Sequence, residues 1–460
     1  MKRALIILSY LLLAVVVVAA TIVLVAVGKG YSYDFKTGRV SLKGLLVLNS
    51  TPQAATVLVN DQEIRRRTPY RATMEAGLYN VEVRKDGFRP WQKRLVINPS
   101  GVTFIPYALL VPQEIKATTL ISNRSVSQLA ATRDRRHFAY VTTGPDAGVW
   151  TLNFDRREGT KRYSPKPASP DQPAEVIESV TWADDGSRLL VKSVVGATPA
   201  YTLVSTNGGP AALNLTELFR FDFSGLTFNP KNSRELYWTS PEGLRCLDVE
   251  ARTVSAVLAE KVSAFTFAGD RILYVQTTAL GKTVWSMDGA GRDPKRLIES
   301  LAESPSYELA YVNVRDKDYL AVLPHQAGTA TVYIDIFSAT PTAKVVSKAA
   351  QHITFSDDGR YLAFYSADGF GSYDTEKDIV RATEANNLTH LSWYDGSHVL
   401  VNRQGQLQLA EFDGANMNDI TKVGPAVPAY STNDQRFIVT LRPGAGEAAG
   451  FEITAAEIKR

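Results

Sequence analysis

Cysteine is almost absent from this 460-residue sequence, which contains only Cys246. A disulfide framework is therefore excluded, and so are zinc sites built from CxxC pairs, because both need more than one cysteine. Cys246 stands in a strand-like run between Leu244 and Leu247, which predicts a buried and unreactive thiol. A large charge of one sign is also missing: the formal net charge of +4 is too small to indicate a nucleic-acid partner.

Sequence patterns for catalysis and metal binding are missing as well. There is no HExxH motif and no GxSxG nucleophile elbow, and no pair of histidines has the spacing of metal ligands. The histidines are His137, His325, His352, His390 and His398. His352 and His390 each stand just before the first strand of a repeat, and we interpret them as ordinary strand-edge residues. The oxygen-rich segment Asp413–Asp419 lacks the ligand spacing of a calcium loop and is predicted to be a plain hairpin loop. We predict no catalytic, cofactor-binding or metal-binding residues.

The longest hydrophobic run begins directly after Lys2 and Arg3. It extends from Ala4 to Val27, and as a helix it measures about 36 Å, enough to cross a hydrocarbon core of about 30 Å. Its many Leu, Ile and Val residues contribute on the order of −5 to −10 kcal/mol to insertion. The sequence therefore predicts an uncleaved signal-anchor transmembrane helix at residues 1–29.

A cleaved signal peptide is the alternative reading of this run. Val18-Ala19-Ala20 has the small residues of a cleavage site, but the apolar run continues to Val27 and exceeds the core of about 7–15 residues typical of signal peptides. The positive-inside rule places Lys2 and Arg3 in the cytoplasm, although Lys29 on the other flank weakens the bias. We expect a single-pass protein of the cytoplasmic membrane with its N-terminus inside and the bulk of the chain extracytoplasmic.

Residues 30–43 are short, polar and aromatic, and are predicted to be a tether. Tyr31, Tyr33 and Phe35 are expected in the headgroup zone of the membrane, where aromatic side chains are enriched. The alternative is that these aromatic residues begin the next fold.

Residues 44–112 alternate between apolar and polar residues in short segments separated by turn residues. Gly77–Arg84 and Trp91–Ile97 are examples, with the turn residues Lys85–Phe88 between them. Strands of this length and spacing predict a small β-sandwich.

This region resembles a PEGA domain in the order and spacing of its motifs. The matching motifs are Ser50-Thr51-Pro52, Ala55-Thr56-Val57, Val59-Asn60, Thr68-Pro69, Gly77-Leu78-Tyr79, Val81-Glu82-Val83, Lys85-Asp86-Gly87-Phe88 and Trp91. The namesake tetrapeptide departs from the family: Pro52-Gln53-Ala54-Ala55 stands where Pro-Glu-Gly-Ala is usual, which puts the conformation of that turn in question. The resemblance implies a non-catalytic, extracytoplasmic binding or spacer module.

The sandwich region is basic. Residues 36–116 contain 13 Lys or Arg against 6 Asp or Glu. Four arginines cluster within seven positions, and we predict them as a contact for an anionic surface such as lipid headgroups or envelope polymers. They are Arg65, Arg66, Arg67 and Arg71. The alternative is a solvated loop whose charge aids solubility.

Residues 113–460 repeat a unit of an aromatic-ended strand, an Asp-Gly turn and a second apolar strand. The clearest copies are Trp182–Val191, Phe355–Phe364 and Trp393–Val401. The second strands recur about every 43 residues, as in four-stranded propeller blades. We predict a β-propeller, with eight blades favoured and seven possible. The last blade lacks a strand, which Thr118–Ile121 from the start of the region is expected to supply.

These repeats resemble those of the TolB and WD40-like propeller superfamily. Ser356–Phe364 matches the pattern Ser-Pro-Asp-Gly-(Lys/Arg)-x-Leu-Ala-(Phe/Tyr), with Asp357 in place of proline, while the Trp-Asp pair that ends WD40 blades is missing. The resemblance implies the fold and leaves the task open, because propellers serve many functions.

The sequence as a whole predicts an all-β protein on a single membrane span. The favoured function is a binding or scaffold protein of the cell envelope, with the propeller as interaction platform and the PEGA-like domain as spacer or envelope contact. The expected partners are the membrane and an envelope protein or cell-wall glycan, with no cofactor. One alternative is a glycan-active enzyme, a glycosidase or lyase with its site in the propeller channel; a weaker one is a sensor that signals inward through a membrane partner.

Overall fold

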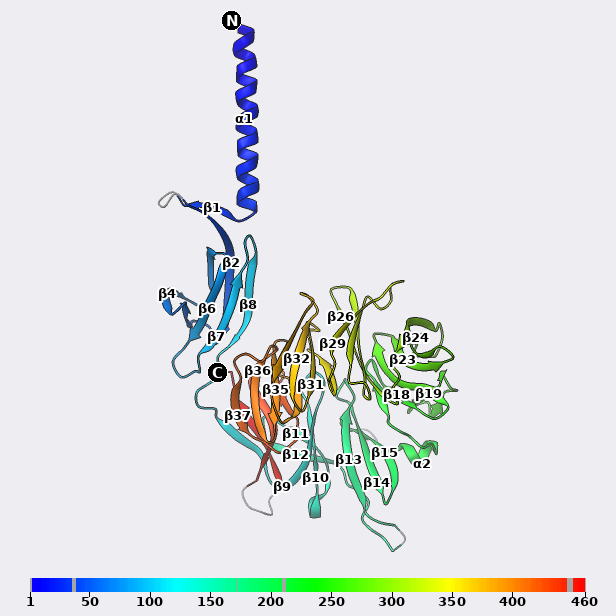
Figure 1. Cartoon of the computed structure of the whole chain (residues 1–460). Helices are drawn as coiled ribbons and strands as arrows, with labels where there is room; N and C mark the ends of the chain where they lie inside the picture. The colour runs from blue at the N-terminus through cyan, green and yellow to red at the C-terminus, as the bar shows by residue number, and fades with distance from the viewer. Residues whose placement is uncertain (1, 35–38, 171, 209–211, 445–449, 460) are drawn as a thin grey trace. The chain divides into compact units, whose positions relative to one another are not determined.

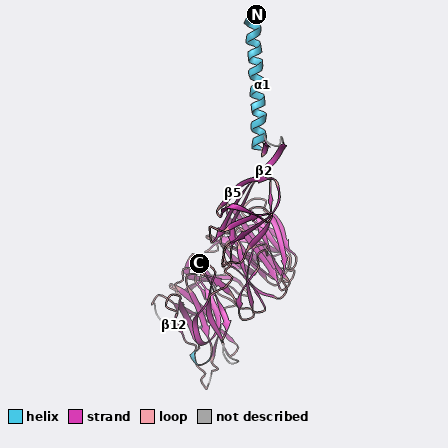
Figure 2. Ribbon diagram, turned by 90° about the vertical axis from the view of Figure 1, so that its left-hand side faces the viewer, coloured by secondary structure: helices cyan, strands magenta, loops and turns pink. Residues whose placement is uncertain are grey.

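The computed structural model describes residues 2–34, 39–170, 172–208, 212–444 and 450–459. The chain divides into two compact units, one of Met1–Ile115 with Ile458–Arg460 and the other of Lys116–Glu457. Figure 1 traces both units, and Figure 2 shows that strands account for nearly all of the regular structure apart from one long helix. The predicted all-β fold with an N-terminal helix is confirmed.

The long helix α1 (Lys2–Gly28) is apolar on every side. Its Ile7–Gly28 segment has a mean hydropathy of 3.1, is not buried by the rest of the protein, and is long enough to cross a membrane. A fully exposed apolar helix of this length is unfavourable in water and favourable in a bilayer.

The segment predicted as a tether is partly folded. Strand β1 (Tyr31–Asp34) pairs antiparallel with the start of β2 (Arg39–Thr51), in the register Tyr31 to Leu42 and Tyr33 to Val40. Regular structure thus begins within a few residues of the helix, because apolar and polar residues alternate in this segment and it pairs with a neighbouring strand. This agrees with the alternative prediction, in which Tyr31 and Tyr33 begin the next fold. Phe35 lies outside the described residues.

Two sheets form the N-terminal sandwich. The first contains β1, β2, β5 (Tyr70–Glu75) and β8 (Val102–Leu109), and the second contains β4 (Gln62–Arg67), β3 (Thr56–Val59), β6 (Gly77–Arg84) and β7 (Trp91–Ile97). The alternate residues that face inward form one core, with Leu46, Leu48, Val83, Trp91 and Ile97 almost completely buried.

The turn that departs from the namesake tetrapeptide keeps a left-handed residue. Ala54 has φ of +58°, a region that glycine enters freely and alanine enters at a cost of about 1 kcal/mol. Its N–H donates to the carbonyl of Thr68 at 2.9 Å, and Thr68 in turn bonds Ser50 side chain to side chain at 2.6 Å. The surrounding contacts therefore hold the turn in a conformation that its sequence disfavours.

The second unit is a propeller of eight blades. The first strands of blades 1 to 8 are β9 (Ala117–Ala131), β13 (Glu175–Trp182), β17 (Thr227–Asn229), β22 (Val262–Ala268), β26 (Tyr307–Val314), β30 (His352–Phe355), β34 (Leu388–Trp393) and β38 (Ala429–Ser431). The second strands are β10 (Phe138–Thr142), β14 (Arg188–Val195), β18 (Asn232–Thr239), β23 (Arg271–Thr278), β27 (Lys317–Pro324), β31 (Tyr361–Ser366), β35 (His398–Arg403) and β39 (Phe437–Pro443).

The outer strands complete the blades. The third strands are β11 (Gly148–Asn153), β15 (Thr198–Ser205), β19 (Gly243–Asp248), β24 (Gly281–Asp288), β28 (Ala330–Ile334), β32 (Gly369–Asp374), β36 (Gln406–Glu411) and β40 (Phe451–Glu457). The fourth strands of blades 1 to 7 are β12 (Glu158–Tyr163), β16 (Leu213–Asn214), β20 (Thr253–Val254), β25 (Lys295–Leu301), β29 (Thr342–Ser347), β33 (Ile379–Glu384) and β37 (Asn418–Lys422). Short additions are η1 (Gly144–Asp146), α2 (Leu215–Phe219) and β21 (Ala259–Glu260), which also pairs with β19.

The ring is closed by the segment that the sequence predicted for this role, Thr118–Ile121, which lies in the first half of β9. The first half of β9 pairs with β40, with Thr119 opposite Thr454 and Ile121 opposite Ile453, and its second half pairs with β10. One strand is therefore the outer strand of blade 8 and the inner strand of blade 1, which confirms the predicted closure and the favoured count of eight.

Contacts between neighbouring blades make the ring continuous. First strands adjoin one another, as β22 does β26, β26 does β30 and β34 does β38, so they line the centre. Side chains bond across the joints: the Trp182 indole N–H donates to the Ala130 carbonyl at 3.4 Å, and the Tyr237 hydroxyl donates to the Gly289 carbonyl at 2.9 Å. Both faces of each second strand are covered by neighbouring blades. This burial explains why the second strands of the repeats are continuous apolar runs.

A cavity in the propeller channel

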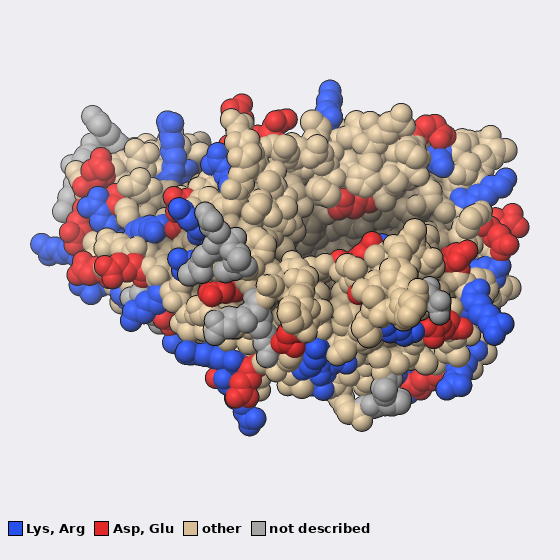
Figure 3. All heavy atoms as spheres, turned by 90° about the horizontal axis from the view of Figure 1, so that it is seen from below, with Lys and Arg blue, Asp and Glu red and all other residues tan. Residues whose placement is uncertain are grey.

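A polar cavity of about 460 Å³ lies among the first strands of the propeller. Its wall is formed by β26, β30, β34 and β38 and by the turn between β9 and β10. Five blades thus contribute side chains to one space, within the size range of small-ligand sites. The face of the propeller seen from below is visibly hollowed, with acidic side chains on the wall of the hollow (Figure 3).

Three ionisable residues occupy one register position in three consecutive blades. Tyr311, Phe355 and Trp393 pair with equivalent residues of their second strands, and the residues three positions earlier are Glu308, His352 and His390. All three of these earlier residues line the cavity. Repetition of the blade geometry therefore brings a carboxylate and two imidazoles to one side of the channel.

Glu308 organises this group. One of its carboxylate oxygens accepts the backbone N–H of Ile353 at 3.1 Å, and the other lies 3.4 Å from Nδ1 of His352. The His352 ring is tilted against the Tyr365 ring with centroids 5.0 Å apart. Burial raises the pKa of the Tyr365 phenol to about 12, with help from the nearby Glu308 charge.

His390 is the less exposed of the two imidazoles. Burial lowers the pKa of the His390 imidazole, and the neighbouring His352 lowers it further. His390 is therefore neutral at neutral pH and presents one hydrogen-bond donor and one acceptor. The cavity offers both a carboxylate-linked imidazole and an uncharged one.

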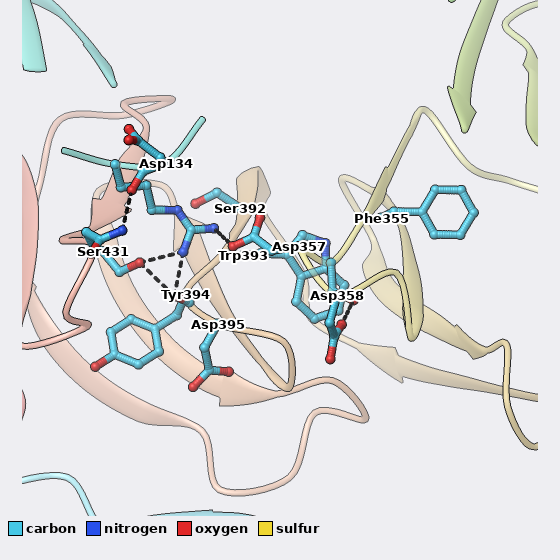
Figure 4. Close-up of polar contacts among 12 residues, drawn as sticks. Asp134, Phe355, Asp357, Asp358, Ser392, Trp393, Tyr394, Asp395 and Ser431 are labelled. Carbon is cyan, nitrogen blue, oxygen red and sulfur yellow. Dashed lines mark hydrogen bonds and ion pairs between the residues drawn. The ribbon is translucent and has the colours of Figure 1, made fainter. Parts of the chain in front are cut away.

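Arg135, in the turn between β9 and β10 of blade 1, contacts three blades from the other end of the propeller sequence. Its guanidinium lies 2.6 Å from the Asp357 carboxylate of blade 6, and it donates to the Tyr394 carbonyl of blade 7 at 2.9 Å and to the Ser431 hydroxyl of blade 8 at 2.8 Å. Figure 4 shows these acceptors converging from different turns. The Arg135 side chain is only 13% exposed, so this contact fixes one wall of the cavity.

Aromatic rings supply the apolar part of the wall. Phe355, Trp393 and Tyr430 all line the cavity, and the Trp393 indole N–H donates to the Thr354 carbonyl at 3.2 Å. Burial raises the pKa of the Tyr430 phenol to about 12. Flat apolar rings beside hydrogen-bonding imidazoles can bind a ligand that has both an apolar face and polar edges.

The four arginines predicted from the sequence lie elsewhere, in the N-terminal sandwich. Arg65, Arg66 and Arg67 are on the edge strand β4, and Arg71 is on β5; all four are exposed. They lie on strands of two different sheets and belong to a different unit from the cavity.

The remaining predicted positions are structural. Cys246 is half-buried on β19, and burial raises the pKa of its thiol to about 12, as an unreactive thiol requires. Residues 412–417 form the predicted hairpin loop between β36 and β37, and Asn418 and Asp419 begin β37. Among the described residues, no group of three or more His, Cys, Asp or Glu has a geometry that would hold a metal ion.

Sequence reasoning missed Glu308 and Arg135. It noticed that His352 and His390 occupy equivalent places but interpreted them as strand-edge residues. Aligning the blades on their second strands would have added Glu308, because it stands at the same offset. Arg135 gives no such signal, because its partners are far away in the chain.

Comparison with known proteins defines the class. Residues 43–109 match the PEGA domain family. No curated protein matches the chain. The chain thus combines one PEGA domain with one propeller.

Among solved structures, the chain is similar to a eukaryotic initiation factor, at 12% identity, covering 74% of this chain and 89% of that one with a TM-score of 0.47. It is similar to an oligogalacturonate lyase in complex with manganese, at 14% identity, 74% and 98% coverage and a TM-score of 0.42. It is also similar to the β-propeller domain of Myceliophteria thermophila Cps50 (Swd1), at 14% identity, 65% and 97% coverage and a TM-score of 0.40. Likeness at this level says nothing about activity, so the propeller assignment rests on the sheet pairing above.

Proposed function

We propose that this chain is a membrane-anchored binding protein of the cell envelope. In this proposal α1 holds the chain in the cytoplasmic membrane, the PEGA domain is a spacer outside it, and the TolB-like propeller is the platform that receives an envelope protein or cell-wall glycan. The observation that carries the proposal is the channel cavity, in which five blades contribute aromatic rings, imidazoles and a carboxylate to one space.

The arrangement of the carboxylates favours binding over the alternative of a glycosidase or lyase. In the described part of the chain, two carboxylates line the cavity, and each has a basic partner: Glu308 lies 3.4 Å from His352, and Asp357 lies 2.6 Å from Arg135. A glycosidase of the usual kind needs two carboxyl groups that act together on one bond. These two are committed to holding the wall of the cavity.

Capture by the full chain tests the proposal. A photo-crosslinking residue replacing Phe355 in the membrane-embedded protein is expected to trap a defined envelope component. His352→Ala is expected to reduce that capture, because it removes a wall group, while the exposed His325→Ala outside the cavity is the matched control. Equal capture by the two histidine variants, or turnover of an envelope glycan that depends on Glu308, would overturn the binding proposal.

A further inference from the structure

The hairpin that follows the helix presents an apolar face. Because Tyr31 pairs with Leu42 and Tyr33 with Val40, the four side chains lie on the same face of the two strands. Their exposed fractions are 45% for Tyr31, 37% for Leu42, 52% for Tyr33 and 64% for Val40. Four large side chains left open together on a two-stranded hairpin indicate a surface that something covers.

This face stands next to the end of the apolar helix. The N–H of Gly30 donates to the carbonyl of Val27 at 2.9 Å, and the N–H of Lys43 on β2 donates to the carbonyl of Gly30 at 2.8 Å. Tyr31 lines a shallow apolar groove together with Ile22 and Val25 of α1. The hairpin is thus tied to the point at which α1 leaves the bilayer, with no flexible spacer between them.

Of the four clustered arginines, Arg71 lies within reach of the same level. Arg71 stands opposite Val47 on β2, four residues beyond Lys43, which is a distance of about 13 Å along a strand. A headgroup layer of roughly 5–8 Å and a long arginine side chain span most of that distance. Arg65, Arg66 and Arg67 on β4 lie farther away: Arg67 and Arg84 both pair with Thr56, so the three arginines are near the far end of β6, roughly 20 Å beyond the level of Leu42. All four guanidinium groups lack an ion-pair partner among the described residues.

The charge balance separates this part of the chain from the rest. Residues 1–115 carry 15 Lys or Arg against 7 Asp or Glu, whereas residues 116–460 carry 36 against 40. An anionic bilayer therefore attracts the sandwich and not the propeller.

We infer that the PEGA domain binds the bilayer surface itself, with the Tyr31, Leu42, Tyr33 and Val40 face in the headgroup zone and Arg71 on anionic headgroups. Tyrosine is suited to this zone because its ring is apolar and its hydroxyl is polar. The inference rests on the proposed anchorage by α1 and adds a second contact with the same bilayer.

Lipid quenching of a fluorophore tests this contact in the full chain. The label is attached at Tyr33→Cys in a Cys246→Ser background, and the matched control carries it at Leu280→Cys, a still more exposed apolar position on a propeller turn. The proteins are placed in brominated phosphatidylcholine vesicles with and without phosphatidylglycerol. We expect quenching at position 33 and none at 280, with position 33 quenched at least about twofold more in the anionic vesicles because each basic residue adds to attraction.

Arg71→Gln isolates the charge contribution, and the combined Arg65→Gln, Arg66→Gln and Arg67→Gln variant is its matched control farther from the bilayer. Arg71→Gln is expected to weaken the dependence on phosphatidylglycerol more than this control does, and high salt is expected to have the same effect on the unchanged protein. Absence of quenching at position 33 in vesicles that retain the protein after alkaline washing would overturn this inference and leave the anchorage intact. Release of the protein by the wash would overturn the anchorage itself.

Discussion

Arginine has different roles in the two parts of this molecule. Twelve propeller arginines form ion pairs: Arg133, Arg135, Arg136, Arg188, Arg234, Arg245, Arg271, Arg292, Arg296, Arg315, Arg360 and Arg436. Several of these pairs join neighbouring blades, as Arg315 and Glu376 do at 2.7 Å. The four clustered arginines of the sandwich have no such partner among the described residues. The same side chain stabilises a ring in one unit and leaves its charge available to a partner in the other.

The largest effect is expected when Arg135 is removed, because it is the least exposed of the twelve ion-paired arginines. Arg135→Ala is expected to destabilise the propeller by about 2–4 kcal/mol, because one ion pair and two hydrogen bonds that join four blades are lost together. Arg136→Ala, at the 67% exposed neighbour in the same turn, is the control and is expected to cost less than about 0.5 kcal/mol. Hydrogen exchange measured by mass spectrometry reports each unit separately, and equal losses would refute the distinction.

A substitution in the sandwich is expected to act in the opposite direction. Ala54→Gly should stabilise the sandwich by about 0.5–1 kcal/mol, because glycine adopts the positive φ of this turn without a Cβ clash. Hydrogen exchange in peptides from residues 44–109, followed by mass spectrometry, measures this change in stability. The neighbouring Ala55→Gly is the control and is expected to destabilise, since Ala55 is fully buried and packs in the core. A destabilised Ala54→Gly variant would show that the turn is not strained.

A smaller difference between the units is expected on acidification. All five histidines are in residues 116–460. Burial lowers the pKa of His390 below its ordinary 6.5, so in acid the unfolded chain takes up a proton that the folded propeller resists. This contribution is fully present above pH 6.5 and is lost as the pH falls towards the folded pKa. Denaturant midpoints at pH 7.5 and 5.5 should therefore diverge less in His390→Gln than in the unchanged protein.

The smallest expected effect concerns the sandwich arginines. The combined Gln variant of Arg65, Arg66, Arg67 and Arg71 is expected to change the stability of either unit by less than about 0.5 kcal/mol, because exposed and unpaired charges contribute little. Urea unfolding followed by hydrogen exchange checks this. A loss of several kcal/mol in the sandwich would mean that these residues hold the fold, and that the comparison with the propeller fails.

The fold could be predicted to a large extent because its signals are local. The 43-residue recurrence of Asp-Gly hairpins predicted the blades, and the surplus strand at Thr118–Ile121 predicted the closure, since an edge without a partner is unfavourable. The first strand of the sandwich was harder to predict than the blades, because β1 has only four residues. Whether it forms a strand depends on its pairing with Val40 and Leu42 of β2.

The cavity was less accessible to sequence reasoning. Glu308, His352 and His390 are separated by about 40 residues each, and only their common place in the blade geometry brings them together. The bonds of Arg135 to Asp357 and Tyr394 span more than 200 residues. Neither a sequence repeat nor a local motif predicts a contact between blades so far apart in the chain. Such a contact becomes visible only in the closed ring.

Strand β9 belongs to both blade 1 and blade 8, so the ring can close only after the last blade has been synthesised. This strand is among the first parts of the propeller to be made, yet half of its hydrogen-bond partners belong to β40, more than 300 residues later. Such a long-range pairing forms slowly, because the intervening chain must be ordered first. Until then the half-built ring exposes two unpaired strand edges, which are sites for aggregation. A truncation that removes Phe451–Glu457 therefore opens the whole ring, because blade 8 loses its third strand and half of β9 loses its partner.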